Sequence, residues 1–272
     1  MAGEFHHNLQ LDADGEGHAD TVQQTRFRIN ISIFVKITLP VMNPMLKSKR
    51  ILAAALLFAG TAVMFFLPSV AIPHKIFIPL TVLALFSIKI TPWTVTTGLF
   101  FSALGDLAGS FKTGGDPQEF YAFVFQMLFF ALAHIFYIIT FLKLTPGKTS
   151  GLRTLACSAI CAIVYLSALL LIVPCVEDTV LTFCVIGYAT IITVMLFSGL
   201  RTADPVIAIG ACLFVFSDYI LAWNMFVSPI NGSRYFIMVP YYLAQLTFAA
   251  RFAYLHYCRV ASATEMKPPV AR

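Results

Sequence analysis

Hydrophobic residues occur in long runs between residues 51 and 257, and short polar segments separate the runs. Each run has about the 17–25 residues that an α-helix needs to cross a bilayer. The connections are rich in Gly, Pro, Asn and Asp, which is typical of turns. The pattern therefore predicts an all-α fold, a polytopic membrane helix bundle with eight transmembrane helices. The runs lie at 51–68, 72–90, 92–110, 119–142, 152–173, 178–199, 204–226 and 234–257.

The amino-acid composition also indicates a membrane protein. Of the 272 residues, 59% are hydrophobic and 11% are charged, against about 25% charged residues in soluble proteins. Such a chain has too little polar surface to cover a soluble core, which excludes a soluble globular domain, a disordered protein and a disulfide-rich module. The six cysteines form no CxxC pair. Cys157 and Cys161 share a helix face, and we expect them to pack as small buried side chains.

The hydrophobic runs are flanked by two different kinds of segment. Residues 1–28 are polar and lack the basic and apolar regions of a signal peptide, so we expect a disordered tail. Residues 29–50 are apolar but are interrupted by Pro40 and Pro44, and we interpret them as a juxtamembrane or interfacial segment. The transmembrane domain is predicted at 51–258 and a cytoplasmic tail at 259–272. Pro79 and Pro240 lie inside runs and are expected to kink the second and eighth helices.

The basic residues predict the orientation of the bundle. An even number of spans places both termini on the same side. With that side inside, the inner segments hold fourteen Lys and Arg residues and the outer loops hold three, which are Lys75, Lys112 and Arg234. The positive-inside rule therefore favours cytoplasmic termini. The net charge of +5 is explained by these loops, and no clustered basic face suggests a nucleic-acid partner.

Two carboxyl groups lie well inside predicted spans, Asp106 in the third helix and Asp218 in the seventh. Each follows its helix start, Pro92 or Asp204, by 14 residues, or about 21 Å. Both helices run outward, so the two carboxyl groups should lie at similar depth. Two close carboxylates in a low dielectric do not both ionise, so one is expected to hold a proton. Such a pair can act as a general acid and base or, alternatively, link helices structurally.

Further polar residues lie at comparable depths in the predicted helices. Gln126 and His134 are eight residues apart and share a helix face, and Tyr137 is one turn beyond His134. The eighth helix adds Tyr241, Tyr242 and Gln245, and the seventh helix adds Asn224. Together these polar residues suggest a polar cavity among the third, fourth, seventh and eighth helices.

The sequence contains no motif for a metal ion or a nucleotide. There is no HExxH, no GxSxG and no glycine-rich phosphate loop. His134 is the one deep histidine, whereas zinc usually requires three or four ligands. We therefore expect no metal and no cofactor.

Four ordered motifs in these helices resemble the lysoplasmalogenase (YhhN) family. The segment from Ser102 to Asp106, SALGD, is similar to the family's SxxGD, and AHIFY at 133–137 is similar to its aHxxY. The segment GACLFVFSD, which ends in Ser217 and Asp218 and continues to Asn224, resembles GAxLFxxSDxxLAxN. YYLAQ at 241–245 resembles YYxAQ. One position departs from the family pattern, because Ile78 stands where a lysine is usual.

The resemblance implies an eight-helix membrane enzyme that cleaves the vinyl ether bond of lysoplasmalogens. The products would be a fatty aldehyde and glycerophosphoethanolamine or glycerophosphocholine. Protonation of the β carbon and addition of water suit a pair of aspartates, so Asp106 and Asp218 are the predicted acid–base pair. His134, Tyr242, Gln245 and Asn224 would position water or the glycerol part. The remaining predicted substrate-binding residues are Ser102, Gln126, Tyr137, Ser217 and Tyr241.

The expected partners are a lysophospholipid substrate and the lipid bilayer. The expected location is the endoplasmic reticulum membrane in a eukaryote or the cytoplasmic membrane in a bacterium. Two other functions remain as alternatives. Paired membrane acids also fit a proton-coupled transporter. An intramembrane aspartyl protease also uses two aspartates, but its GxGD and YD motifs are altered here by Ala103 and Ser217.

Overall fold

The computed structural model describes residues 49–67, 75–111, 118–147 and 150–265. From Arg50 onward the helices belong to one compact unit, Arg50–Arg272. Within the described ranges the fold is all-helical and contains no strand. The elements are α2 (Lys49–Phe66), η1 (Lys75–Phe77), α3 (Ile78–Ser87), α4 (Trp93–Gly109), α5 (Gln118–Leu142), α6 (Gly151–Leu171), η2 (Val173–Cys175), α7 (Thr179–Arg201), α8 (Pro205–Phe226) and α9 (Ser233–Glu265). The predicted tail at 1–28 and residues 29–48 of the interfacial segment lie outside these ranges.

Each predicted hydrophobic run corresponds to one α-helix, with two differences. The second run is divided into η1 and the ten-residue α3. Pro79 lies in the first turn of α3, where its missing N–H leaves no helical hydrogen bond unmade, so it begins a helix and the predicted kink is wrong. Pro240 does lie inside α9, and that helix continues to Glu265, beyond the predicted end at 257.

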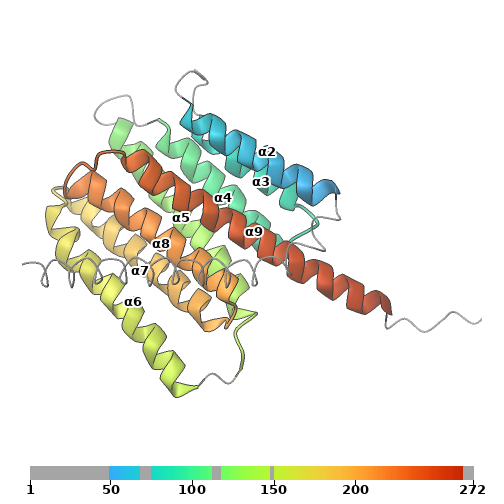
Figure 1. Ribbon diagram of the computed structural model, residues 1–272. Coiled ribbons are helices and arrows are strands. Elements are labelled where there is room, and N and C mark those ends of the chain that lie inside the picture. Colours follow the sequence, from blue (N-terminus) through green and yellow to red (C-terminus); the bar gives the residue numbers. More distant parts are fainter. Residues whose placement is uncertain (1–48, 68–74, 112–117, 148–149, 266–272) are drawn as a thin grey trace, which may run out of the picture. The chain divides into compact units, whose positions relative to one another are not determined.

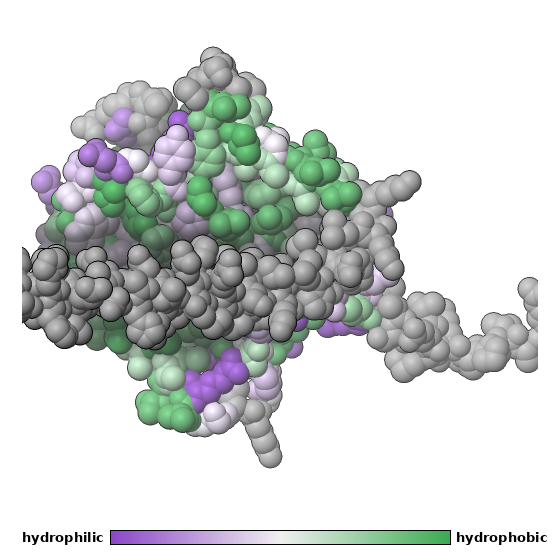
Figure 2. All heavy atoms as spheres, viewed as in Figure 1, coloured by the Kyte–Doolittle hydropathy of each residue, from purple (hydrophilic) through white to green (hydrophobic). Residues whose placement is uncertain are grey.

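Within the described ranges, four helices are long and apolar enough to cross a membrane by length and composition, and they correspond to α5, α6, α7 and α8. Large hydrophobic side chains remain exposed along them, for example Leu152, Leu170 and Phe183, each more than two thirds exposed. Figure 2 shows hydrophobic side chains over much of the visible face. Such a surface is stable against hydrocarbon rather than water, so the chain is an integral membrane protein.

Among the described helices, α4 and α5 make the most extensive contact, and glycines on α4 receive large side chains of α5. An added Cβ at Gly98 would lie 2.5 Å from Tyr137 Cε1. The three contacts have the same spacing along both helices in opposite order, which defines one antiparallel register. These contacts are Gly98 with Tyr137, Gly105 with Phe130, and Gly109 with Gln126. Asp106 directly follows Gly105 in α4. This register therefore also fixes the position of Asp106 relative to α5.

A second tight contact joins α8 and α9, which lie side by side in Figure 1. Gly210 of α8 leaves space for Phe248, since an added Cβ would lie 2.6 Å from Cε1 of that ring. One turn further along α9, Arg251 Nε lies 2.6 Å from Asp204 Oδ2. The other oxygen of Asp204 accepts the backbone N–H of Val206 at 3.0 Å, so Asp204 caps α8. These contacts hold the helix that carries Asp218 against α9.

Candidate active site

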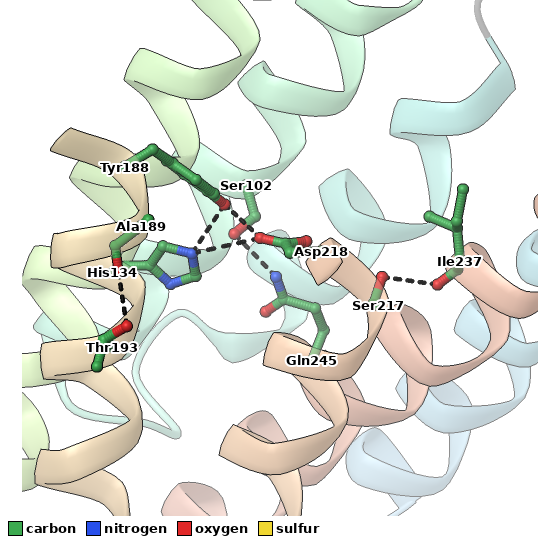
Figure 3. Close-up of polar contacts among 9 residues, drawn as sticks. All are labelled: Ser102, His134, Tyr188, Ala189, Thr193, Ser217, Asp218, Ile237 and Gln245. Atoms are coloured by element: carbon green, nitrogen blue, oxygen red, sulfur yellow. Dashed lines mark hydrogen bonds and ion pairs between the residues drawn. The ribbon is translucent and has the colours of Figure 1, made fainter. Parts of the chain in front are cut away.

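Asp218 of α8 lies in a small polar group with one residue from α5 and one from α7 (Figure 3). The Tyr188 hydroxyl donates to Asp218 Oδ2. His134 Nε2 lies 3.0 Å from the Tyr188 oxygen and 3.8 Å from Asp218 Oδ2. The His134 side chain is fully buried, whereas 11% of the Asp218 side chain is exposed. The carboxyl group of Asp218 therefore has one hydrogen-bond donor, Tyr188, lies close to His134 and remains partly accessible.

The hydrogen bonds of this group also give the direction of the contact between His134 and Tyr188. The Tyr188 hydroxyl has one hydrogen, which it donates to Asp218. The contact between His134 and Tyr188 therefore requires a hydrogen on Nε2, with the tyrosine oxygen as acceptor. His134 Nδ1 is buried and has no hydrogen-bond partner among the described residues.

An apolar pocket lies among α5, α6, α7 and α8, and Asp218 and Tyr188 form part of its wall. Gln126, Thr193 and Tyr219 are the other lining residues with polar side chains. Hydrophobic residues form the rest of the wall. They include Phe123, Met127, Phe130, Val164, Ala168, Ile172, Val185, Ile192, Val215, Leu221, Ala222 and Phe226. A ligand with a long hydrocarbon part and a reactive end could place that end at Asp218 in such a pocket.

Asp106 of α4 has a different environment. It is 2% exposed, and Tyr241 of α9 donates to its Oδ2 at 3.0 Å. Tyr241 packs between Phe130 and Phe214, with ring centroids 5.8 and 5.4 Å away. Among the described residues no hydrogen bond joins Asp106 to Asp218. Asp106 is absent from the pocket wall, which Phe130 helps to form.

Three other predicted residues form a chain of hydrogen bonds that links three helices. Tyr137 of α5 donates to Gln245 Oε1 of α9 at 2.6 Å. Gln245 Nε2 donates to Ser102 Oγ of α4 at 2.9 Å, which Figure 3 also shows. All three residues are fully buried. Because both ends of the Gln245 amide have partners, this chain satisfies its polar groups without a ligand.

Three predicted substrate-binding residues make contacts to the backbone instead. Ser217 donates to the Ile237 carbonyl at 2.8 Å, and Tyr242 donates to the Ile76 carbonyl at 3.2 Å. Asn224 Oδ1 accepts the N–H of Ile230 at 2.8 Å.

Two features of the site could not be read from the family-like motifs. Tyr188 was not among the predicted residues, and the signal available was a single hydroxyl-bearing aromatic residue near the middle of the sixth apolar run. Lys75, which precedes the Ile78 that replaces the usual lysine, donates to the Leu67 carbonyl at 2.8 Å and so caps the end of α2.

In the part of the chain that the structure describes, no three His, Cys, Asp or Glu residues are grouped as metal ligands would be.

The fold and the site together define an integral membrane protein with an ionisable group beside an apolar, intramembrane pocket. The family model described as the YhhN family matches residues 70–252, which is more than half of the chain. The protein therefore belongs to the YhhN family, and the predicted resemblance is confirmed.

The curated proteins that are similar to this chain include proteins named lysoplasmalogenase. The lysoplasmalogenase TMEM86B of Rattus norvegicus is 34% identical over 178 residues, which cover 62% of this chain and 67% of the relative. The lysoplasmalogenase TMEM86A of Homo sapiens is 32% identical over 166 residues, 57% of this chain and 63% of the relative. The matched region thus spans about two thirds of these relatives. No solved structure matches the chain significantly.

Proposed function

We propose that this protein hydrolyses the vinyl ether bond of lysoplasmalogens inside the membrane. The observation that carries the proposal is the position of Asp218, an ionisable carboxyl group in the wall of an otherwise largely apolar pocket. The names of the relatives support the same substrate class. The products are a fatty aldehyde and glycerophosphoethanolamine or glycerophosphocholine.

The reaction requires an acid that protonates the β carbon and a base that takes a proton from the attacking water. A carboxylic acid first protonates the β carbon of the vinyl ether, which leaves an oxocarbenium ion. The resulting carboxylate stabilises this cation and removes a proton from the water that attacks it. The proton taken from water regenerates the acid. The hemiacetal then collapses to aldehyde and alcohol as its hydroxyl proton moves to the leaving glycerol oxygen, so one water is consumed.

We assign the carboxyl group that meets the substrate to Asp218, because Asp218 and not Asp106 lines the pocket. Asp106 is the second member of the pair. Two carboxyl groups in a low dielectric do not both ionise, so we propose that the pair shares one proton and that Asp218 carries it when the substrate binds. Tyr188 binds Oδ2 of Asp218 and so leaves the other oxygen for the substrate, while His134 holds the Tyr188 hydroxyl in place.

We also propose eight spans with both termini in the cytoplasm and a catalytic domain at residues 51–258. The helix order and the charge of the loops support this arrangement. A glycosylation tag inserted at 228–232 is then expected to be modified in microsomes, and a tag at 202–204 is expected to stay unmodified. The reverse pattern would contradict the orientation.

Release of aldehyde from lysoplasmenylethanolamine by the detergent-purified protein tests the function. The parent protein is expected to release aldehyde, and Asp218→Asn and Asp106→Asn are expected to lose that activity wholly or largely. Full activity in both variants would contradict the aspartate mechanism. A folded, monodisperse parent protein that releases no aldehyde would contradict the substrate assignment.

A further inference from the structure

The pocket beside Asp218 lies toward one end of the four helices that form it. Two of its lining residues, Phe226 and Ile172, are at the ends of α8 and α6. Two others, Phe123 and Val185, lie within two turns of the starts of α5 and α7. The starts of α5 and α7 and the ends of α6 and α8 therefore meet at one end of the bundle, which we call the pocket end.

Toward the opposite end the same helices pack closely. Leu196 of α7, Ile207 and Ala211 of α8 and Phe141 of α5 are each at most 2% exposed. At Gly199 of α7 an added Cβ would lie 2.9 Å from the Cβ of Ala211, so the backbone of α7 lies directly against α8. A substrate that came from the opposite end would have to pass through this core to reach Asp218. The pocket end is therefore the side from which Asp218 is accessible.

The depth of Asp218 also favours the pocket end. Along α8 it lies 8 residues before Phe226 and 13 residues after Pro205, which correspond to about 12 Å and 20 Å. A phospholipid keeps its charged head group at the membrane surface, because the burial of ions in hydrocarbon is very costly. A substrate with its vinyl ether at Asp218 therefore has its head group at the nearer surface, which is the surface at the pocket end.

The charges of the connecting segments indicate which surface this is. At the pocket end, segments 111–117, 172–178 and 227–232 together hold one basic and three acidic residues. At the opposite end, segments 143–153 and 201–204 hold four basic residues and one acidic residue, namely Lys143, Lys148, Arg153, Arg201 and Asp204. The positive-inside rule places the basic end in the cytoplasm. The pocket then lies in the half of the membrane that faces away from the cytoplasm.

We propose that the protein takes its substrate from the leaflet that faces away from the cytoplasm and releases the water-soluble glycerophospho product on that side. The inference rests on the proposed function and on the proposed orientation. The reaction that supplies the substrate must then leave the lysoplasmalogen in that leaflet. Such a supply is either hydrolysis of the acyl ester of a plasmalogen on that side or transfer of the lyso lipid across the bilayer.

Sealed proteoliposomes with one protein molecule each test the side of access. A C-terminal affinity tag follows α9, whose Arg251 binds Asp204 at the start of α8, so the tag is expected opposite the pocket end. A resin that binds the tag separates vesicles with the tag outside from vesicles with the tag inside. Lysoplasmenylethanolamine added to the medium enters the outer leaflet, and its charged head group crosses hydrocarbon slowly.

Vesicles with the tag inside are expected to release aldehyde at once, with glycerophosphoethanolamine in the medium. Vesicles with the tag outside are expected to be about 10-fold slower, because the substrate must first cross the bilayer. Detergent is expected to make the two populations equal, which controls for inactive protein, and Asp218→Asn gives the background rate. Equal rates in sealed vesicles, or a faster rate with the tag outside, would overturn the inference.

The glycosylation tag at 228–232 relates the pocket end to the cell, and it is expected to be modified in microsomes. An unmodified tag there, with a modified tag at 202–204, would also overturn the inference. These failures leave the proposed function standing as long as the detergent-opened vesicles release aldehyde. Opened vesicles that release no aldehyde from a folded protein would overturn the proposed function, and the inference with it.

Discussion

The surroundings of Asp218 and Asp106 differ, although both carboxyl groups lie inside apolar helices. Asp218 borders a pocket among α5 to α8, keeps an exposed edge and contacts Tyr188 and His134. Asp106 is enclosed where α4, α5 and α9 pack, and its hydrogen-bond donor is Tyr241. The comparison teaches that burial alone does not define a reactive group. Access to a pocket distinguishes the two sites, and for this reason the proposed mechanism places the substrate at Asp218.

The largest effect is expected from Asp218→Asn. The amide has the same shape but can neither deliver nor accept the catalytic proton, so kcat is expected to fall about 10³-fold. Asp106→Asn acts on the reaction through Asp218 and is expected to lower kcat less, by about 10²-fold. Aldehyde release under saturating substrate measures both values. A greater loss in Asp106→Asn than in Asp218→Asn would reverse the assignment.

Asp178→Asn is the matched control for these variants. Asp178 is an exposed carboxylate at the start of α7, where its Oδ1 accepts the N–H of Leu181 at 2.8 Å. Its replacement is expected to leave kcat close to that of the parent.

The two tyrosines that bind the carboxyl groups sharpen the comparison. Tyr188→Phe removes the donor to Asp218 and keeps the ring in the pocket wall, so kcat is expected to fall about 30-fold with little change in KM, within the range of positioned proton-transfer groups. Tyr241→Phe removes the donor to Asp106, and a smaller loss of kcat is expected. Steady-state kinetics on both variants checks this order, and equal losses would contradict the unequal roles of the two sites.

A smaller effect on catalysis is expected when a larger side chain fills the pocket. Ala168 of α6 lines the pocket, so Ala168→Phe is expected to raise KM for a long-chain substrate about 10-fold, as an altered apolar pocket typically does. Ala162→Phe is the control, because Ala162 is exposed on the same helix. If Ala162→Phe raised KM as much as Ala168→Phe, the substrate chain would have to lie elsewhere.

Substitutions where α4 packs against α5 are expected to change the stability of the protein rather than its substrate binding. Gly98→Ala places a Cβ 2.5 Å from the buried ring of Tyr137, and overpacking of this kind costs about 1–3 kcal/mol. Gly187→Ala meets no atom within 4 Å and is expected to be neutral or to stabilise α7. Thermal unfolding in detergent compares the two. A Gly98→Ala protein as stable as Gly187→Ala would contradict the close α4–α5 contact.

The sequence predicted the helices well because long apolar runs and their proline-rich boundaries are local features. The division of the second run was missed, since whether Pro79 kinks a helix or begins one depends on where the preceding residues pack. Asp106, Asp218, His134 and Gln126 were predicted as candidates because polar side chains are costly inside an apolar run. Their separation into two environments depends on which helices enclose the pocket, and no local pattern encodes that.

Tyr188 illustrates the same limit. It lies in a run without a recognised motif, and a single tyrosine there is ordinary. Its role becomes visible when α7 packs between α5 and α8 and the hydroxyl reaches both Asp218 and His134. Ser217 and Asn224 show the converse, because residues within a motif-like segment use their side chains to bind the backbone of α9 and of the preceding loop.

The most direct test of the central claim is to locate the bound substrate. A lyso ether lipid with a saturated, uncleavable chain and a diazirine on that chain can be crosslinked in the membrane and mapped by mass spectrometry. The account predicts labels on pocket residues of α6, α7 and α8, such as Val164, Ala168 and Tyr219, and predicts that added lysoplasmenylethanolamine suppresses them. Substrate-sensitive labels on α4 and α9 around Asp106, with none in the pocket, would contradict it.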